Sequence, residues 1–344
     1  MIESICLELI NRKSYLANFN LSTIYFGGGT PSLLTEDELL SIIGTIRTNY
    51  LIQDDVEITL ESNPDDISDD NLSIWKSVGI NRLSIGLQSF RSVDLEWMNR
   101  AHNVEEALVC VEKAQHAGFN NLTVDLIYGL PNLSLVEWGN HVQKVIDMGV
   151  PHLSAYCLTV EDKTALNNWV KKGQIAISSE EAQSEQFLHL LAMMEKSGYE
   201  QYEISNFCKT GFESRHNSNY WKGEWYLGVG PSAHSFNGFS RSWNIANNQL
   251  YIKTITSQET VYEKETLSRE DQFNEAILTG LRTSYGVKLA RLDWEYRQSE
   301  DFNEKVEKFI SLQWLLREDD LLLLTREGKL RADYIASELF IESR

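Results

Sequence analysis

Hydrophobic and polar positions follow two alternating periods along the first half of the chain, and this alternation predicts strands and helices in turn. Short apolar runs predict buried strands, whereas apolar residues three and four positions apart predict amphipathic helices. The predicted strands lie at 23–26, 57–60, 82–87, 122–127 and 152–158. The predicted helices lie at 1–17, 35–47, 69–78, 104–117 and 135–148.

Helix-capping residues support these boundaries. Thr35 followed by Glu38 is a capping-box signature at a helix start. Gly79, Gly118 and Gly149 come directly after predicted helices, where a left-handed C-cap residue is typical. Strands that alternate with helices pair in parallel through right-handed crossovers, so the sequence predicts an α/β fold.

A glycine run after the first predicted strand decides between two α/β architectures. The run GGGTP at 27–31 matches neither a dinucleotide-binding fingerprint nor a phosphate-binding loop with its lysine. We therefore expect a complete or partial (β/α) barrel rather than a doubly wound nucleotide-binding sheet.

The pattern changes in the second half. A long helix is predicted at 180–196, and a stretch rich in glycine, asparagine and aromatic residues follows at 206–243. From residue 268 the chain is mainly helical, with one leucine-rich strand at 320–325, as in a small helical or winged-helix module. We predict a partial barrel at 1–205, a connecting region at 206–267 and a C-terminal helical module at 268–344.

Composition excludes several classes of protein. The 344 residues carry 31 Lys and Arg against 50 Asp and Glu, a formal net charge of −19, which argues against a surface that follows a nucleic-acid backbone. Apolar runs such as 321–324 are far shorter than the roughly 20 residues that cross a bilayer. The first residues lack the basic and apolar regions of a signal peptide. We expect a cytoplasmic protein with neither a nucleic-acid partner nor membrane insertion.

Polar residues gather where the predicted strands end. The glycine run, Glu61, Gln88 and Asp125 each stand near the end of a predicted strand, and Arg100 lies in the loop after Gln88. In a β/α barrel these ends meet at one rim, where active sites form. Any one of these residues could instead be a helix N-cap or an unrelated surface residue.

This residue set suits an amino acid joined to a nucleoside. Consecutive glycines let a ligand approach backbone N–H and C=O groups, and an arginine can hold a carboxylate with two parallel bonds. Asp125 and Gln88 could bind ribose hydroxyls, and Glu61 an amine or hydroxyl. The alternative is a glycine turn with unrelated polar neighbours.

Longer motifs then resemble a known family. IYFGGGTPS at 24–32 resembles the glycine motif of radical S-adenosylmethionine (SAM) proteins. ESNP at 61–64, LSIGLQSF at 83–90, RAH at 100–102 and DLIYGLP at 125–131 follow in the order of the oxygen-independent coproporphyrinogen III oxidase family. HNSNYW at 216–221, after YEISNF at 202–207, resembles the HemW-type heme chaperone branch of that family.

The resemblance assigns candidate roles to individual residues. It implies SAM contacts from Gly28, Gly29, Thr30, Glu61, Gln88, Arg100, Asp125 and, less directly, Thr159. It also implies His216 as a heme ligand, with Tyr220 and Trp221 lining the porphyrin and His102 as a second candidate ligand. The alternative for His216 is a buried histidine that caps a loop, with the aromatic residues as core.

The chain departs from the family in its cysteines. The family holds a [4Fe–4S] cluster through C-x-x-x-C-x-x-C, upstream of the glycine motif, whereas this chain begins within what should be the first helix. Its scattered cysteines, without a C-x-x-C pair, lack the required spacing and suggest reduced structural thiols: Cys6, Cys110, Cys157 and Cys208. Either the sequence is a shortened version of a family member, or the protein has lost its cluster. We assign no catalytic residue and no metal ligand.

Three functions remain open at this point. The first is a heme chaperone that binds heme and SAM and passes heme to apo-proteins. The second is oxygen-independent coproporphyrinogen III oxidase, a radical oxidative decarboxylation in porphyrin biosynthesis. The third is a cluster-free protein that binds SAM or a porphyrin. The sequence is also compatible with a homodimer.

Overall fold

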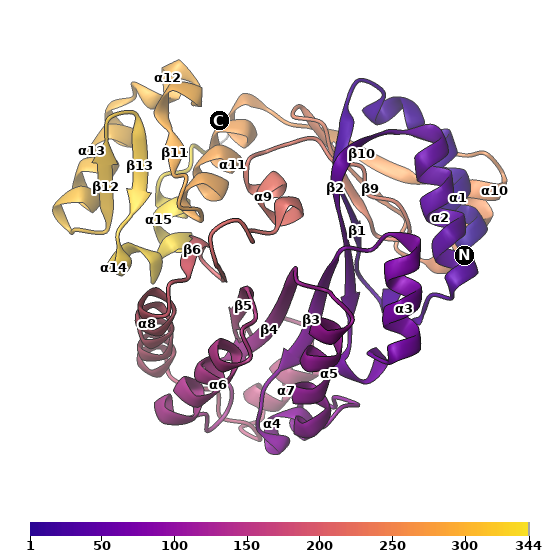
Figure 1. The fold of residues 1–344 in the computed structure, drawn as a ribbon. Coiled ribbons are helices and arrows are strands. Elements are labelled where there is room, and N and C mark those ends of the chain that lie inside the picture. Colours follow the sequence, from indigo (N-terminus) through magenta and orange to yellow (C-terminus); the bar gives the residue numbers. More distant parts are fainter. Residues whose placement is uncertain (343–344) are drawn as a thin grey trace. The chain divides into compact units, whose positions relative to one another are not determined.

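Strands and helices alternate through the first half of the chain, as the sequence predicts (Figure 1). The computed structural model describes residues 1–342. The first five strands are β1 (Asn20–Phe26), β2 (Leu51–Ser62), β3 (Arg82–Gln88), β4 (Leu122–Tyr128) and β5 (His152–Cys157). The main helices between them are α2 (Glu36–Asn49), α3 (Asp69–Val78), α5 (Val104–His116) and α6 (Leu135–Asp147).

The chain divides into two compact units. The central unit contains residues 25–33 and 57–213. The terminal unit contains residues 1–24 and 34–56 together with the chain from residue 214 onward. Segments far apart in sequence therefore belong to one unit.

The principal sheet is open and mostly parallel. Its strand order is β1-β2-β3-β4-β5-β7-β6, with β6 at Glu200–Glu203 and β7 at Asn206–Cys208. The β2–β3, β3–β4 and β4–β5 pairs are parallel, whereas β7 runs antiparallel to both β5 and β6. Because the order has two edge strands, the fold is a partial rather than a complete barrel, and the predicted α/β class is confirmed.

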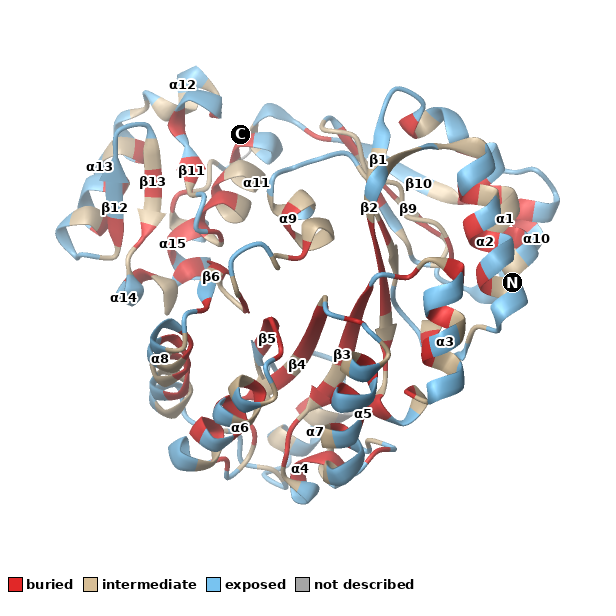
Figure 2. Ribbon diagram, viewed as in Figure 1, coloured by how far each residue is buried: buried red, intermediate tan, exposed pale blue. Residues whose placement is uncertain are grey.

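The middle strands are buried along most of their length (Figure 2). Helices α3, α5 and α6 cover one face of the sheet (Figure 1). In β3 the apolar residues Leu83, Ile85 and Leu87 are fully buried and alternate with polar residues or glycine. Trp75 of α3 and Trp138 of α6 are both fully buried. Capping boxes start the helices: Thr35 with Glu38 as predicted, and also Ser134 with Glu137.

Shorter elements complete the central unit. They are η2 (Pro31–Leu33), η3 (Pro64–Asp66), α4 (Ser92–Trp97), α7 (Ala165–Lys171) and α8 (Glu180–Lys196). The helix predicted at 180–196 is confirmed residue for residue.

The terminal unit carries two small antiparallel sheets. Its first part comprises α1 (Ile2–Asn11), η1 (Lys13–Leu16), α9 (Arg215–Trp221), β8 (His234–Phe236), β9 (Ser240–Asn244), α10 (Asn248–Thr256) and β10 (Tyr262–Thr266). The strands of this part form a sheet of order β10-β9-β8. No helix within residues 1–342 combines the length and apolarity needed to span a bilayer.

The C-terminal module combines helices with a second three-stranded sheet. Its elements are α11 (Arg269–Leu281), β11 (Val287–Lys288), η4 (Leu289–Arg291), α12 (Trp294–Arg297), α13 (Glu300–Ser311), β12 (Leu315–Glu318), β13 (Leu321–Leu324), α14 (Arg326–Lys329) and α15 (Ala332–Glu338). The sheet order is β11-β13-β12. Strand β13 is the predicted leucine-rich strand, and the helical C-terminal module is confirmed.

One buried carboxylate joins three elements of the terminal unit. Glu8 of α1 is fully buried, and its Oε1 accepts hydrogen bonds from Arg12 Nη1 (3.1 Å) and Asn244 Nδ2 (2.8 Å). Its Oε2 accepts from Gly230 N (2.9 Å) and Tyr251 Oη (2.6 Å). Because four donors satisfy this carboxylate, α1 is held to β9 and α10.

We expect Glu8→Ala to lower the free energy of unfolding by about 3–5 kcal/mol, because it leaves Arg12 buried without its carboxylate partner. Urea denaturation followed by circular dichroism measures the change. Glu3→Ala is the matched control, since Glu3 lies on the same helix but is exposed. Equal stability of the two variants would show that the Glu8 network does not hold α1.

Candidate functional site

The residues predicted to contact SAM all lie in the central unit, most of them at or just beyond the end of a strand. Gly28, Gly29 and Thr30 follow β1, Glu61 lies in β2, Gln88 ends β3, Asp125 lies in β4 and Thr159 follows β5. Arg100 lies in the loop between α4 and α5. In a β/α barrel the C-terminal ends of parallel strands meet at one rim, so residues placed there can contact the same ligand.

Glu61 ties the glycine turn to β2. Its Oε2 accepts a hydrogen bond from Gly28 N (3.0 Å), and its Oε1 accepts one from Tyr25 Oη (2.7 Å). Gly28 and Gly29 both have positive φ angles, +72° and +59°, which a side chain would oppose. The turn therefore keeps its backbone exposed while one carboxylate fixes its position.

Gln88 and Arg100 converge on Gly86. A Cβ atom on Gly86 would lie 2.9 Å from Gln88 Nε2 and 3.4 Å from Arg100 Nη2, so a side chain there would displace the ends of both residues. Arg100 Nη2 donates to Asn63 Oδ1 (2.9 Å) and to Gly86 O (3.1 Å). Its Nε is buried and has no hydrogen-bond partner among the described residues. This arginine thus retains donor capacity for a ligand.

The backbone is strained at the same strand end. Gln88 has a φ of 67°, in the left-handed region that a glutamine rarely adopts. The β3–β4 register also shifts between Ile85 and Gln88. Such a conformation costs stability and persists because the surrounding structure holds it in place.

Asp125 is a carboxylate with a perturbed protonation equilibrium. Its neighbours include Ser154, which faces it in the β4–β5 register, and Ser84, whose Oγ lies 3.4 Å from Oδ2. The pKa of Asp125 is raised to about 6, chiefly by desolvation; the Ser154 hydrogen bond opposes this rise, and the nearby Glu61 carboxylate adds to it. The effect of the Glu61 carboxylate on the pKa of Asp125 indicates that the two groups lie in one part of the site. Thr159, by contrast, is exposed, and its hydroxyl donates to Cys157 O (3.3 Å) within its own turn.

The heme candidates at 216–221 form helix α9 of the terminal unit. His216 Nδ1 lies 3.0 Å from Thr23 Oγ1 of β1, and its ring meets Tyr220 edge to face at 5.2 Å between centroids. Burial lowers the pKa of His216 to about 4, so the ring is neutral at physiological pH. Trp221 packs differently: the Arg282 guanidinium stacks over its ring at 5.3 Å, and its Nε1 is buried without a partner among the described residues.

His102 lies in the central unit and therefore not in the same unit as α9. It is buried, with Nε2 3.2 Å from Leu87 O and Nδ1 4.0 Å from an Asp65 carboxylate oxygen. Burial lowers its pKa. Its observed contacts are those of a packed histidine that supports the end of β3.

The cysteines of this chain do not fit an iron–sulfur cluster. Cys110 and Cys208 are buried, and burial raises the pKa of each thiol to about 12, so neither forms a thiolate readily. Within residues 1–342, no three His, Cys, Asp or Glu side chains gather to hold a metal ion.

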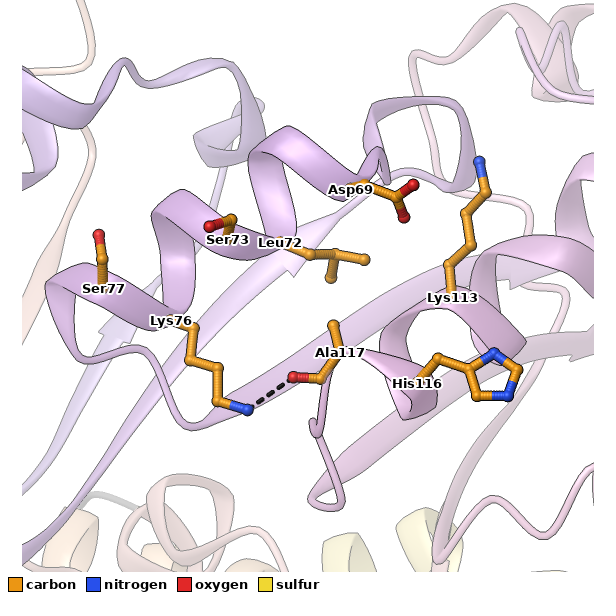
Figure 3. A pocket seen from close by; sticks show the side chains of 8 residues that line it. All are labelled: Asp69, Leu72, Ser73, Lys76, Ser77, Lys113, His116 and Ala117. Atoms are coloured by element: carbon orange, nitrogen blue, oxygen red, sulfur yellow. Dashed lines mark hydrogen bonds between the residues drawn. The ribbon is translucent and has the colours of Figure 1, made fainter.

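A surface hollow of about 530 Å³ lies between α3 and α5 (Figure 3). Lys76, Lys113 and His116 line it, and Lys76 Nζ donates to Ala117 O at 2.6 Å. None of the strand-end residues lines this hollow, so it is separate from the candidate site.

Sequence reasoning missed several residues that hold the site together. Tyr25 binds Glu61, Asn63 binds Arg100, and Ser154 faces Asp125. Tyr25 and Asn63 lie inside the motifs at 24–32 and 61–64, so their place in these motifs could have identified them from the sequence. Nothing in the sequence indicates that Thr23 meets His216, because 193 positions separate them.

The sequence and the fold of this chain are similar to those of known proteins. The radical SAM superfamily matches residues 7–145, and the HemN C-terminal domain matches residues 267–331. The heme chaperone HemW of Bacillus subtilis is 34% identical, over 94% of this chain and 86% of its own length. The heme chaperone HemW of Mycobacterium tuberculosis is 32% identical, over 92% and 80%. The structure of coproporphyrinogen III oxidase (HemN) from Escherichia coli shares the fold, with a TM-score of 0.82 at 19% identity over 98% of this chain and 82% of that one.

We expect the stability of the protein to fall as pH rises from about 4 to about 6. In this interval the folded state keeps the Asp125 proton that the unfolded chain releases, because the folded pKa is the higher one. Asp125→Asn should abolish this fall and stabilise the protein by about 2–3 kcal/mol at pH 7.5. Urea denaturation between pH 4 and 8 measures both effects.

The control is Asp54→Asn, since Asp54 is an exposed residue of β2. This variant should retain the pH dependence of the original protein. An Asp125→Asn profile that follows the original curve would contradict the raised pKa.

Proposed function

This chain belongs to the HemW family of heme chaperones within the radical SAM superfamily, and from that premise we propose that it binds heme and SAM and delivers heme to apo-proteins. The observation that carries the proposal is helix α9, which presents a neutral histidine and an adjacent tyrosine ring. A cytoplasmic location belongs to the same proposal.

His216 supports heme binding through its chemistry. A neutral imidazole is the form that ligates heme iron, and an aromatic ring beside it offers a face to the macrocycle. Tyr220 lies one helical turn further, on the His216 side of α9, and 41% of it is exposed. Trp221 contributes differently in this proposal: its stacking with Arg282 packs α9 against the C-terminal module.

The strand-end residues support SAM binding. Arg100 suits the carboxylate of the methionyl group, Glu61 suits its ammonium, and Asp125 suits the ribose hydroxyls. The buried Nε of Arg100 and the exposed backbone of the glycine turn are the features that fit such a ligand. In radical SAM enzymes a reduced cluster cleaves SAM to a 5′-deoxyadenosyl radical. The described cysteines do not fit that cluster, so the proposal is confined to binding.

The oxidase alternative has less support. The Escherichia coli oxidase is 19% identical in sequence, so its similarity to this chain shows a shared fold only. The Bacillus subtilis and Mycobacterium tuberculosis relatives, at 34% and 32% identity, are named heme chaperones.

We expect hemin to bind the protein with a shifted Soret band, and His216→Ala to weaken that binding at least tenfold because the iron loses its ligand. Spectrophotometric titration measures the affinity. His116→Ala is the control, since His116 is an exposed histidine of α5. An unchanged spectrum and affinity in His216→Ala would reject this residue as the ligand.

We expect Arg100→Met to weaken SAM binding by about tenfold or more, because charged hydrogen bonds to the ligand carboxylate are lost. Equilibrium dialysis with labelled SAM measures the affinity. Lys113→Met is the matched control, since it also removes one cation from the central unit but lines the separate hollow. Equal affinity of both variants would remove Arg100 from the SAM site.

A further inference from the structure

A row of buried polar side chains leads away from Asp125 across the sheet of the central unit. Ser154 of β5 faces Asp125 in the β4–β5 register, and Asn206 of β7 faces Ser154 in the next strand pair. The Ser154 hydroxyl donates to Asn206 Oδ1 at 3.0 Å, and Asn206 Nδ2 donates to Glu203 Oε2 at 2.6 Å. Ser154, Asn206 and Glu203 are 4%, 4% and 2% exposed, so these bonds are shielded from bulk water.

Glu203 determines which way the Asn206 amide points. A carboxylate accepts hydrogen bonds, so the Asn206 group beside Glu203 Oε2 is the NH2, and the carbonyl oxygen is turned toward Ser154. Glu203 Oε2 also accepts from Ser205 N at 2.9 Å, which holds the carboxylate in place. Asn206 therefore presents an acceptor to the Ser154 hydroxyl.

One Ser154 proton serves two strong acceptors. The first is Asn206 Oδ1, and the second is the Asp125 carboxylate, whose pKa is lowered by its hydrogen bond with Ser154. A hydroxyl donates a single proton, so the two acceptors compete for it, while the Thr123 hydroxyl, 3.3 Å from Ser154 Oγ, can donate to that oxygen. An ionised carboxylate is the stronger acceptor, whereas a protonated one can itself donate to Ser154 Oγ. The direction of the Ser154 proton thus depends on the charge of Asp125.

The other charged and titratable groups that face Asp125 come from four strands. They are Tyr25 of β1, Glu61 of β2, Arg82 of β3 and Tyr156 of β5. Glu61 raises the pKa of Asp125 and Arg82 lowers it. Burial raises the pKa of both tyrosines, so the phenols keep their protons at physiological pH, and Tyr156 can donate to Ser154 as well as face Asp125. None of these four effects requires Asn206, so a variant of Asn206 reports on the Ser154 proton.

We propose that Ser154 is a positioning residue for SAM binding: its hydroxyl donates to Asp125 when this carboxylate is ionised and turns to Asn206 when the carboxylate takes up a proton from water. This inference rests on the proposed function, since it assumes that Asp125 binds the ribose of SAM. The ionised carboxylate is the stronger acceptor for ribose hydroxyls. Ser154 and Asn206 therefore set the pH below which the site loses affinity for SAM.

The first test follows the titration of Asp125 in the apo-protein. Carbon-13 NMR of aspartate-labelled protein reports the midpoint, and Asp125→Asn identifies the signal. We expect a midpoint at about pH 6 in the unaltered protein. Ser154→Ala should raise the midpoint, because the ionised carboxylate loses a donor. Asn206→Leu should lower it, because the protonated state loses the acceptor to which Ser154 turns.

Double variants show whether the effect of Asn206 passes through Ser154. In the Ser154→Ala background, Asn206→Leu should leave the Asp125 midpoint unchanged, because the hydroxyl that links the two residues is gone. Ser84→Ala is the matched control: Ser84 Oγ also lies 3.4 Å from Asp125 Oδ2, but β4 and β5 separate its strand from Asn206. In the Ser84→Ala background, Asn206→Leu should still lower the midpoint.

The second test measures SAM binding by equilibrium dialysis with labelled SAM between pH 5 and 8. Below the Asp125 midpoint we expect the affinity to fall toward about tenfold for each pH unit, because the ionised fraction falls by that factor. Ser154→Ala should move this fall to higher pH, and Asn206→Leu should move it to lower pH. Asp54→Asn, at an exposed residue of β2, should follow the unaltered curve.

These readouts separate the inference from the function on which it rests. An Asp125 midpoint that is unchanged in Ser154→Ala, or lowered equally by Asn206→Leu with and without Ser154, would overturn the role of Ser154. Failure of the unaltered protein to bind SAM at any pH would overturn the proposed SAM binding, whatever the titration of Asp125. Thermal unfolding confirms that each variant folds. Ser154→Cys, which keeps a weak donor, should give an intermediate midpoint and replaces Ser154→Ala if that variant does not fold.

Discussion

Parallel pairing of β2, β3 and β4 determines which polar groups of the central unit can meet. Glu61 pairs with Ser84, and Ser84 pairs with Thr123, two residues before Asp125. Because these strands run in one direction, their carboxyl ends lie at the same end of the sheet. Glu61, Gln88 and Asp125 are placed toward this end. The glycine turn after β1 adds exposed backbone at this end, where Gly28 N donates a hydrogen bond to the Glu61 carboxylate.

The same end of the sheet also contains several features that are unfavourable in the ligand-free protein. Gln88 occupies a left-handed conformation, Asp125 is desolvated beside another carboxylate, and Arg100 Nε is buried without a partner among the described residues. Each feature costs stability in the ligand-free protein. The occurrence of all three features at one end of the sheet is typical of a preformed binding site, in which a ligand would supply the missing hydrogen-bond partners.

The local part of this structure could be predicted from the sequence, and the rest depends on contacts between distant residues. The strand–helix periodicity, the Thr35 capping box and the polar strand ends are local patterns, each of which depends on residues only a few positions apart. Short elements such as β8 and β11, with three and two residues, are too brief to show any period. The motif at 216–221 could be recognised from its letters. Its helical form and its attachment to Thr23 could not, because β1 lies far away in sequence.

Strand β1 takes part in both candidate sites. Thr23 reaches the ring of His216, and Tyr25, two residues further, donates to Glu61 beside the glycine turn. The division between the two units falls inside β1, so Thr23 belongs to the terminal unit and Tyr25 to the central unit. Each of the two side chains therefore serves the candidate site of its own unit.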